Sequence, residues 1–306
     1  MNTSTKKILQ KAQKQGYAVG AFNINNMEIA QAVVEAAERE KSPVILQTSE
    51  GAVNYAGMDM LVSISKQVAG RADVPVVLHF DHGKNINMVT AAITEGYDSV
   101  MYDGSSHSFE NNIKNTKLIV EKAHKKGASV EAELGAIAGI EDFVSVEEKD
   151  ANLTNPEQAK EFVKETKCDF LAIAIGTSHG AYKFSKKSNL DMKRLEEIRK
   201  QVSVPLVLHG ASSVPRKIVK KIDKLGGDIG KAKGVSDRNL KNAVKGGICK
   251  VNTDTDLRLA FTLGVRNSLK KNPEYFDPRK ILKPAYEEMV DIVRWKIRLL
   301  GSKGKA

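Results

Sequence analysis

Short apolar runs alternate with longer amphipathic stretches along the whole chain. The runs have the length and β-branched composition of buried strands, and the stretches between them carry apolar residues at helical spacing. The pattern predicts eight strands, at Tyr17–Ile24, Pro43–Thr48, Val74–Phe80, Ser99–Tyr102, Ser129–Leu134, Phe170–Ile175, Pro205–His209 and Ile248–Val251. Helices predicted between them include Met27–Arg39, Met58–Val68, Phe109–Lys125, Pro156–Glu165, Leu190–Gln201 and Ile218–Leu225.

Eight alternating strand and helix units predict a parallel sheet whose two faces are covered by helices. Over 306 residues, this number of units favours a closed (β/α)8 TIM barrel over an open doubly wound sheet. A dinucleotide-binding fold is disfavoured because no GxGxxG motif follows the first strand. No low-complexity linker divides the chain, so we expect residues 1–306 to form a single domain.

Two segments depart from the regular alternation. Residues 135–154 form the longest irregular stretch, and loops of this length in compact domains often serve as lids. Pro278–Leu300 has the spacing of a long C-terminal amphipathic helix, and we expect the six residues after it to fray.

The net charge of +11, from 48 lysines and arginines against 37 acidic residues, raises the question of a polyanionic partner. The basic residues are dispersed over helical segments, and only 6% of residues are aromatic. We therefore expect solvated helix faces and no nucleic-acid partner, with a positive mouth for a small phosphorylated substrate as the second interpretation.

The N-terminus lacks an apolar leader, and no apolar run is long enough to span a bilayer, which predicts a cytoplasmic protein without a membrane partner. The two cysteines, Cys168 and Cys249, are too far apart for a disulfide framework or a CxxC site. Both are expected to be buried free thiols in a reducing compartment.

Polar side chains that titrate or bind metals follow several of the predicted strands. His82, His179 and His209 are three of the six histidines and each closes an apolar run. Because the carboxyl ends of barrel strands meet at one mouth, three imidazoles there indicate a Zn²⁺ site, with Asp103 and Glu133 as outer or alternate ligands. Alignment of the strand ends matches His79, not His82, with His209, so the choice between these two stays open on spacing alone.

Three segments after the last strands are rich in small and hydroxyl residues. They are Ser178 to Lys183, His209 to Pro215, and Asn252 to Asp256. Such residues let backbone N–H groups approach an anion, and barrels often bind phosphate after strands seven and eight. Each segment alone would be an ordinary cap or turn, and only their joint position beside the histidines predicts a phosphate site.

At these motifs the sequence resembles the class II, metal-dependent fructose-bisphosphate aldolases over nearly its whole length. The matching segments are Gly20–Asn23, Leu78–Gly83, Asp103–Ser105, Glu131–Gly135, Gly176–Gly180, His209–Ser212 and Asn252–Asp256. The usual His-Gly-Gly-Ser-Gly segment is altered, because Ala211 and Ser213 stand where that pattern has glycines.

The resemblance implies a catalytic Zn²⁺ held by His82, His179 and His209, with Asp103 and Glu133 at positions that hold a second or displaced metal; a monovalent cation is a further expectation. It also implies that Asp81 is the catalytic acid/base and that Glu141, on the long loop, exchanges the other proton. Positions matching substrate contacts are Ser49, Gly180, Lys183, Gly210, Ser212, Asn252, Asp254, Thr255 and, for the second phosphate, Arg258 and Arg279, the latter across a dimer interface.

The implied activity is reversible cleavage of fructose 1,6-bisphosphate to dihydroxyacetone phosphate and glyceraldehyde 3-phosphate through a Zn-stabilised enediolate, by a homodimer or homotetramer. A tagatose 1,6-bisphosphate aldolase is the alternative, since it shares these motifs and its substrate differs only in configuration at C4. A basic barrel that binds nucleic acid and a non-catalytic metal scaffold are the non-enzymatic alternatives, but neither would need Asp81 or the phosphate segments.

Overall fold

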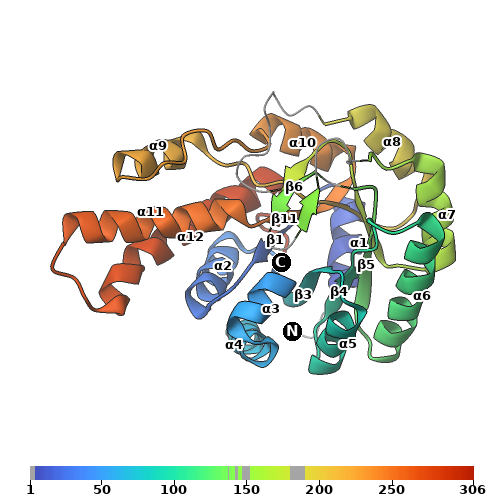
Figure 1. The fold of residues 1–306 in the computed structure, drawn as a ribbon, viewed down its shortest axis with the longest axis horizontal. Coiled ribbons are helices and arrows are strands. Elements are labelled where there is room, and N and C mark those ends of the chain that lie inside the picture. Colours follow the sequence, from blue (N-terminus) through green and yellow to red (C-terminus); the bar gives the residue numbers. More distant parts are fainter. Residues whose placement is uncertain (1–3, 137, 142–143, 147–151, 180–189) are drawn as a thin grey trace.

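The computed structural model describes residues 4–136, 138–141, 144–146, 152–179 and 190–306, with the side chains of residues 138–141, 144–146 and His179 outside the description. All eight predicted strands are present and close into a parallel barrel in the order β1-β11-β10-β8-β5-β4-β3-β2 (Figure 1). The predicted fold class is therefore confirmed. The barrel strands are β1 (Val19–Asn23), β2 (Val44–Ser49), β3 (Val76–Gly83), β4 (Ser99–Tyr102), β5 (Ser129–Leu134), β8 (Phe170–Ile173), β10 (Leu206–Leu208) and β11 (Ile248–Thr253).

Helices surround this barrel, and each of the six named in the sequence pattern is present with shifts of a few residues at its ends. The described helices are α1 (Thr5–Gln15), α2 (Met27–Glu40), α3 (Glu50–Ala56), α4 (Met58–Arg71), α5 (Ile86–Glu95), α6 (Phe109–Lys125), α7 (Pro156–Thr166), α8 (Met192–Gln201), α9 (Arg216–Lys224), α10 (Asp237–Gly246), α11 (Thr255–Lys271) and α12 (Pro278–Leu300). None of them is both long enough and apolar enough to cross a membrane.

Helix α1, which the sequence pattern did not predict, closes the barrel at the amino ends of its strands. Its buried face carries Ile8, Leu9 and Ala12, which join the inward-facing apolar side chains of the strands in one cluster. The buried Thr5 hydroxyl donates to Ser99 Oγ at the start of β4 over 3.0 Å. With this end filled, the opposite end, where the strands finish, is left to form the mouth.

A second, small sheet lies over the mouth, within and beside the stretch expected to be irregular. Strand β6 (Ala138–Glu141) pairs antiparallel with β7 (Val144–Val146) and parallel with β9 (Ser178–His179). The prediction of an unstructured loop over residues 135–154 is therefore wrong for its described part. Hydrogen bonding to β9 gives the segment a partner that its own sequence does not reveal.

The long C-terminal helix is confirmed, but its end is ordered rather than frayed. Helices α11 and α12 run side by side away from the barrel as a hairpin, and α12 returns to pack on α2 (Figure 1). Beyond α12, Gly304 N donates to Glu40 O and Ala306 N donates to Lys41 O, at 2.9 and 3.0 Å. These bonds to the end of α2 hold the last six residues in place.

Glu40, at the end of α2, anchors α12 through a buried carboxylate. Its side chain is 1% exposed and accepts from Arg294 Nε at 2.8 Å and from Arg298 Nε at 2.9 Å. The hydrogen bond from Arg298 outweighs burial, which acts in the opposite direction, and lowers the pKa of Glu40 from 4.5 to about 2. The charged form of Glu40 is thus more stable in the folded protein than in the unfolded chain.

Replacing Glu40 by Gln is expected to lower the melting temperature by about 3 to 6 °C at neutral pH, because two charge-assisted contacts are lost. A carboxyl whose folded pKa is depressed stabilises the fold above its unfolded pKa and loses that contribution as pH falls through its folded pKa. The difference in melting temperature between wild type and Glu40→Gln should therefore be constant above roughly pH 5.5. It should shrink as the pH falls from 4.5 to about 2.

Calorimetric melting of both proteins across this range checks the effect. Glu196→Gln is the control, since Glu196 pairs with Lys200 on an exposed helix face and should give little change. A difference between wild type and Glu40→Gln that persists undiminished at the lowest pH would contradict the role of the charge.

Candidate active site

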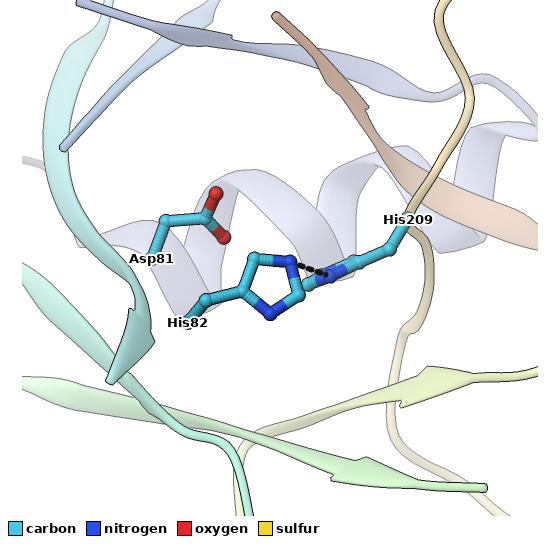
Figure 2. A group of neighbouring side chains, drawn as sticks. All are labelled: Asp81, His82 and His209. Atoms are coloured by element: carbon cyan, nitrogen blue, oxygen red, sulfur yellow. Dashed lines mark hydrogen bonds between the residues drawn. The ribbon is translucent and has the colours of Figure 1, made fainter. Parts of the chain in front are cut away.

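Asp81 and His82 both face the barrel mouth although they are consecutive residues of β3. In a regular strand such neighbours point to opposite faces. The backbone of His82 has a left-handed conformation, with φ of 51°, and the pairing of β3 with β4 shifts between Phe80 and Gly83. This irregularity turns the His82 side chain to the same side as Asp81 (Figure 2). Left-handed non-glycine residues are uncommon and concentrate at functional sites.

His209, which follows β10, meets His82 across the mouth. The distance between His209 Nδ1 and His82 Nε2 is 2.8 Å, and the two rings stand nearly perpendicular at 81° (Figure 2). Asp81, His82 and His209 offer ligand atoms that all lie within 4.8 Å of one another, as do His82, Asp103 and Glu133. Five metal ligands were predicted, and the side chains of four of them are described. These four fall into the two groups, which share His82.

The carboxylates beside these rings suit a cation. Glu133 Oε2 is buried without a hydrogen-bond partner among the described residues, and it lies 3.5 Å from His209 Nδ1 and 3.9 Å from His82 Nδ1. Asp103 Oδ2 lies 3.4 Å from His82 Nδ1, and its other oxygen accepts from the Ser105 hydroxyl. A buried carboxylate is stable when it is paired with a charge or coordinates a metal, so this donor set fits a divalent ion.

Burial and neighbouring charges shift the pKa values of His82 and Glu133. Burial opposes a charge on His82, but Asp81, Asp103 and Glu133 together raise its pKa to about 10. The pKa of Glu133 is raised well above its usual value, first by burial and then by the negative charge of Asp103. Negative charge that favours a proton on an imidazole also favours a bound cation at this group.

Asp81 is held by amide side chains rather than by cations. Its Oδ2 accepts from Asn23 Nδ2 at 3.1 Å and from Gln47 Nε2 at 2.9 Å, and its Oδ1 accepts from Asn252 Nδ2 at 3.0 Å. The donors come from β1, β2 and β11, so three strands fix the orientation of one carboxylate. Four strands thus contribute to a group placed to accept or deliver a proton beside His82.

One of the predicted phosphate segments begins at Asn252, a donor to this carboxylate, and the loop after His209 is joined to that segment. Gly210 has φ of 59°, and a Cβ atom there would approach Ser178 O to 2.6 Å, so only glycine fits. Ser212 Oγ accepts from Asp254 N at 3.2 Å, which joins the loop after β10 to the start of α11. Ser49 caps α3 and lies in register with Asp81. The loop after β10 and the start of α11 are thus joined, and the start of α3 lies in register with Asp81.

A buried ion pair behind the loop holds its shape. Lys296 Nζ, from α12, lies 2.9 Å from Asp256 Oδ2, with both side chains fully buried, and donates to Ser213 Oγ at 2.8 Å. Asp256 also accepts from the backbone N–H groups of Ser213 and Val214 at 3.0 and 2.7 Å. Val214 has φ of 49°, a strained conformation for a β-branched residue, which these two bonds maintain.

The remaining predicted site residues differ in how much of them the structure describes. The backbone of His179 lies in β9 opposite Gly139 of β6, which brings the strand that ends at Glu141 beside it. The side chains of His179 and Glu141, and all of Gly180 and Lys183, lie outside the described residues. Arg258 pairs with Asp254 at 2.7 Å near the mouth, on the helix whose first residue is Thr255.

Arg279 does not join the others. It is the second residue of α12, is 90% exposed, and contacts only Asp277 among the described residues. The α11–α12 hairpin extends away from the barrel (Figure 1). The proposed contact of Arg279 with substrate therefore stays a prediction that needs a second chain.

Several polar residues of the site carry signals that the sequence reading passed over. Gln47 and Lys250 each stand inside an apolar strand, where a polar residue needs a buried partner. Lys296 stands on the apolar face of α12 in the same way. His79, left open between metal ligand and core, is fully buried below the site and contacts Ser99 Oγ at 2.8 Å. The two cysteines are buried and free, as predicted.

A closed barrel with histidines and carboxylates grouped at the carboxyl ends of its strands defines a metal-binding barrel enzyme. The sequence model of the family described as "Fructose-bisphosphate aldolase class-II" matches residues 3–305. The chain is 53% identical over 300 residues to the fructose-bisphosphate aldolase of Thermus caldophilus, covering 98% of each chain. The chain belongs to the class II fructose-bisphosphate aldolase family, a family of metal-dependent lyases.

The chain is also similar to two aldolases with other names. The chain is similar to the YdjI aldolase of Escherichia coli K12, with a TM-score of 0.82, 33% identity and complete coverage of both chains. It is also 41% identical over 302 residues to the D-tagatose-1,6-bisphosphate aldolase subunit GatY of Klebsiella oxytoca, covering 99% of this chain and 98% of that one.

Removing one partner of the Asp256–Lys296 pair is expected to be strongly destabilising, because the other charge is left buried and unpaired. Asp256→Asn and Lys296→Met should each lower the free energy of unfolding by about 3 kcal/mol or more, and the double variant by less than their sum. Urea denaturation of the four proteins measures this coupling. Lys117→Met, which removes an exposed partner of Glu165, serves as the control. Additive losses would show that the two side chains act independently.

Proposed function

We propose that the chain catalyses the reversible aldol cleavage of fructose 1,6-bisphosphate to dihydroxyacetone phosphate and glyceraldehyde 3-phosphate. The observation that carries the proposal is the position of Asp81, which is fixed by three amide donors immediately beside the His82–His209 pair. Aldol cleavage needs one group that moves a hydroxyl proton next to another that stabilises the charge developing at the neighbouring carbon. The mouth contains both.

The proton steps can be assigned to side chains of this chain. In the cleavage direction Asp81 takes the proton of the C4 hydroxyl, the C3–C4 bond breaks, and the C4 oxygen becomes the aldehyde carbonyl. The bond electrons remain on C3 of the dihydroxyacetone phosphate half, where Glu141 delivers a proton. Pairing of β6 with β9 supports this assignment, because it puts the strand that ends at Glu141 over the mouth.

We propose Zn²⁺ as the ion, with His82, His179 and His209 as its ligands. Imidazole ligands with an open position are typical of catalytic Zn²⁺, which supplies a Lewis acid for substrate oxygens when bound. Asp103 and Glu133 are candidates for a second or displaced ion, because they form a separate group with His82. A monovalent cation is a further candidate.

Both phosphates would bind at the mouth. The loop from Gly210 to Ser212 and the start of α11 suit the ketose phosphate, together with Ser49 and the undescribed Gly180 and Lys183. Arg258, in the first turn of α11, is our candidate for the second phosphate. We further propose a homo-oligomer in which the α11–α12 hairpin reaches another chain, because its tip carries the 92% exposed Phe276 next to Arg279.

A coupled assay with both ketohexose bisphosphates tests the activity. Turnover is expected on fructose 1,6-bisphosphate, at a higher kcat/KM than on tagatose 1,6-bisphosphate, since the relative with the tagatose name is less similar than the one from Thermus caldophilus. Exhaustive chelation should abolish cleavage and added Zn²⁺ should restore it. Cleavage that resists chelation and is trapped by borohydride would indicate a lysine Schiff base and refute the proposal. A preference for the tagatose substrate would select the alternative aldolase.

The two proton-transfer roles are separated by a pair of variants. Asp81→Ala should reduce kcat by about a hundred- to ten-thousand-fold while zinc content stays at the wild-type level. Glu141→Gln should slow exchange of the C3 hydron of dihydroxyacetone phosphate with water, which nuclear magnetic resonance follows directly. Loss of zinc from Asp81→Ala would reassign Asp81 as a ligand. Unchanged hydron exchange in Glu141→Gln would assign the second proton transfer to another group.

A further inference from the structure

Lys250 lies inside the barrel, below the metal-binding group and without any access to solvent. It belongs to β11, and its side chain and that of Glu131 on β5 are both 0% exposed. Its Nζ lies 2.9 Å from Glu131 Oε2 and donates to Asn252 Oδ1 over 2.8 Å. These two partners are also the neighbours of Asp81 and His209, so Lys250 lies between the two working parts of the site.

We infer that Lys250 is a positioning residue that fixes both the orientation of the Asn252 amide at Asp81 and the tautomer of His209. The inference rests on the proposed aldolase function for its kinetic consequences, but its structural consequences do not depend on that function. It follows from which of these groups can donate and which can accept a hydrogen bond.

The first consequence concerns Asn252 and Asp81. A lysine ammonium has three donors and no acceptor, so the atom of Asn252 that faces it must be the amide oxygen. The Asn252 NH2 group is then directed to the other side, where it donates to Asp81 Oδ1 at 3.0 Å. An amide rotated by 180° would direct N–H groups at the ammonium and an oxygen at the carboxylate. Lys250 therefore determines that Asp81 receives a donor from β11.

The second consequence concerns Glu131 and His209. Glu131 Oε1 lies 2.7 Å from His209 Nε2, and an ionised carboxylate only accepts hydrogen bonds. The proton of a neutral His209 must then be on Nε2, which leaves the lone pair of Nδ1 directed at His82 and the metal-binding group. Lys250 Nζ lies 2.9 Å from the other oxygen of this carboxylate, in the barrel interior, where an unpaired carboxylate would be strongly disfavoured.

A purely structural ion pair would stabilise the barrel without affecting either group. The two interpretations differ in what a variant should lose. If Lys250 sets both orientations, then Lys250→Met, which keeps the length and removes the charge, should disturb the metal ligand and the acid/base together. Glu131→Gln should disturb mainly the metal ligand, and Asn252→Leu mainly the acid/base.

The experiment measures zinc affinity, kcat and the His209 tautomer on the zinc-loaded full-length proteins. Zinc affinity, from competition with a chromogenic chelator, is expected to fall about 10- to 100-fold in Lys250→Met and Glu131→Gln. It should stay within about twofold of wild type in Asn252→Leu, whose kcat should instead fall at least about tenfold, like that of Lys250→Met. Long-range proton–nitrogen spectra should show a protected His209 Nε2–H in the wild type that is lost or shifted in Lys250→Met.

Glu40→Gln is the control for lost stability, since it breaks another buried ion pair at the end of α2 and should leave all three readouts unchanged. If Lys250→Met does not fold, Lys250→Gln replaces it, because glutamine offers an N–H donor without a charge. Zinc affinity and kcat are then both expected to fall, and the decrease in kcat should be the smaller one. Zinc affinity and a His209 signal like those of the wild type in a folded Lys250 variant would overturn the inference. A wild-type protein without aldol cleavage would overturn only the proposed function.

Discussion

The ion pair between Lys250 and Glu131 in the barrel interior is the contact around which the other polar groups are arranged. Two charges fully removed from water are stable there only because they lie 2.9 Å apart and each has a further polar partner. Helix α1 and the inward-facing apolar cluster fill the barrel at its amino end. His82, His209 and Asp81 lie at the mouth. The pair therefore marks the boundary between packed core and chemical site.

The strand pattern predicts the fold well because barrel strands are short, apolar and separated by helices of ordinary length. It predicts the position of the site for a related reason, since residues that follow parallel strands gather at one end. It does not decide between His79 and His82. Period-two alternation places His79 and Asp81 on one face and His82 on the other, and only the left-handed backbone at His82 reverses this. Such a conformation depends on pairing with β4, which the sequence alone does not specify.

The pattern of apolar and polar residues does not predict contacts between distant parts of the chain. The order of the last residues depends on the end of α2, and the small sheet over the mouth depends on β9. Lys296 meets Asp256 only because α12 folds back along α11. Of these contacts only that of Lys296 has a local signal, a polar side chain on an apolar helix face, and the signal does not name its partner. The sequence therefore indicates that a buried contact exists and the fold determines which one.

The loop after His209 shows how a departure from the family pattern is accommodated. Ser213 replaces a glycine of the usual segment, and its hydroxyl accepts from Lys296 Nζ while its N–H donates to Asp256. A neighbouring glycine, Gly234, lets the chain pass close to the carbonyl of Ser212, where a Cβ atom would approach to 2.3 Å. The conformational freedom that glycine would give is thus replaced by a buried ion pair. Because Asp256 of this pair also holds the strained backbone of Val214, the shape of the loop is fixed by the ion pair.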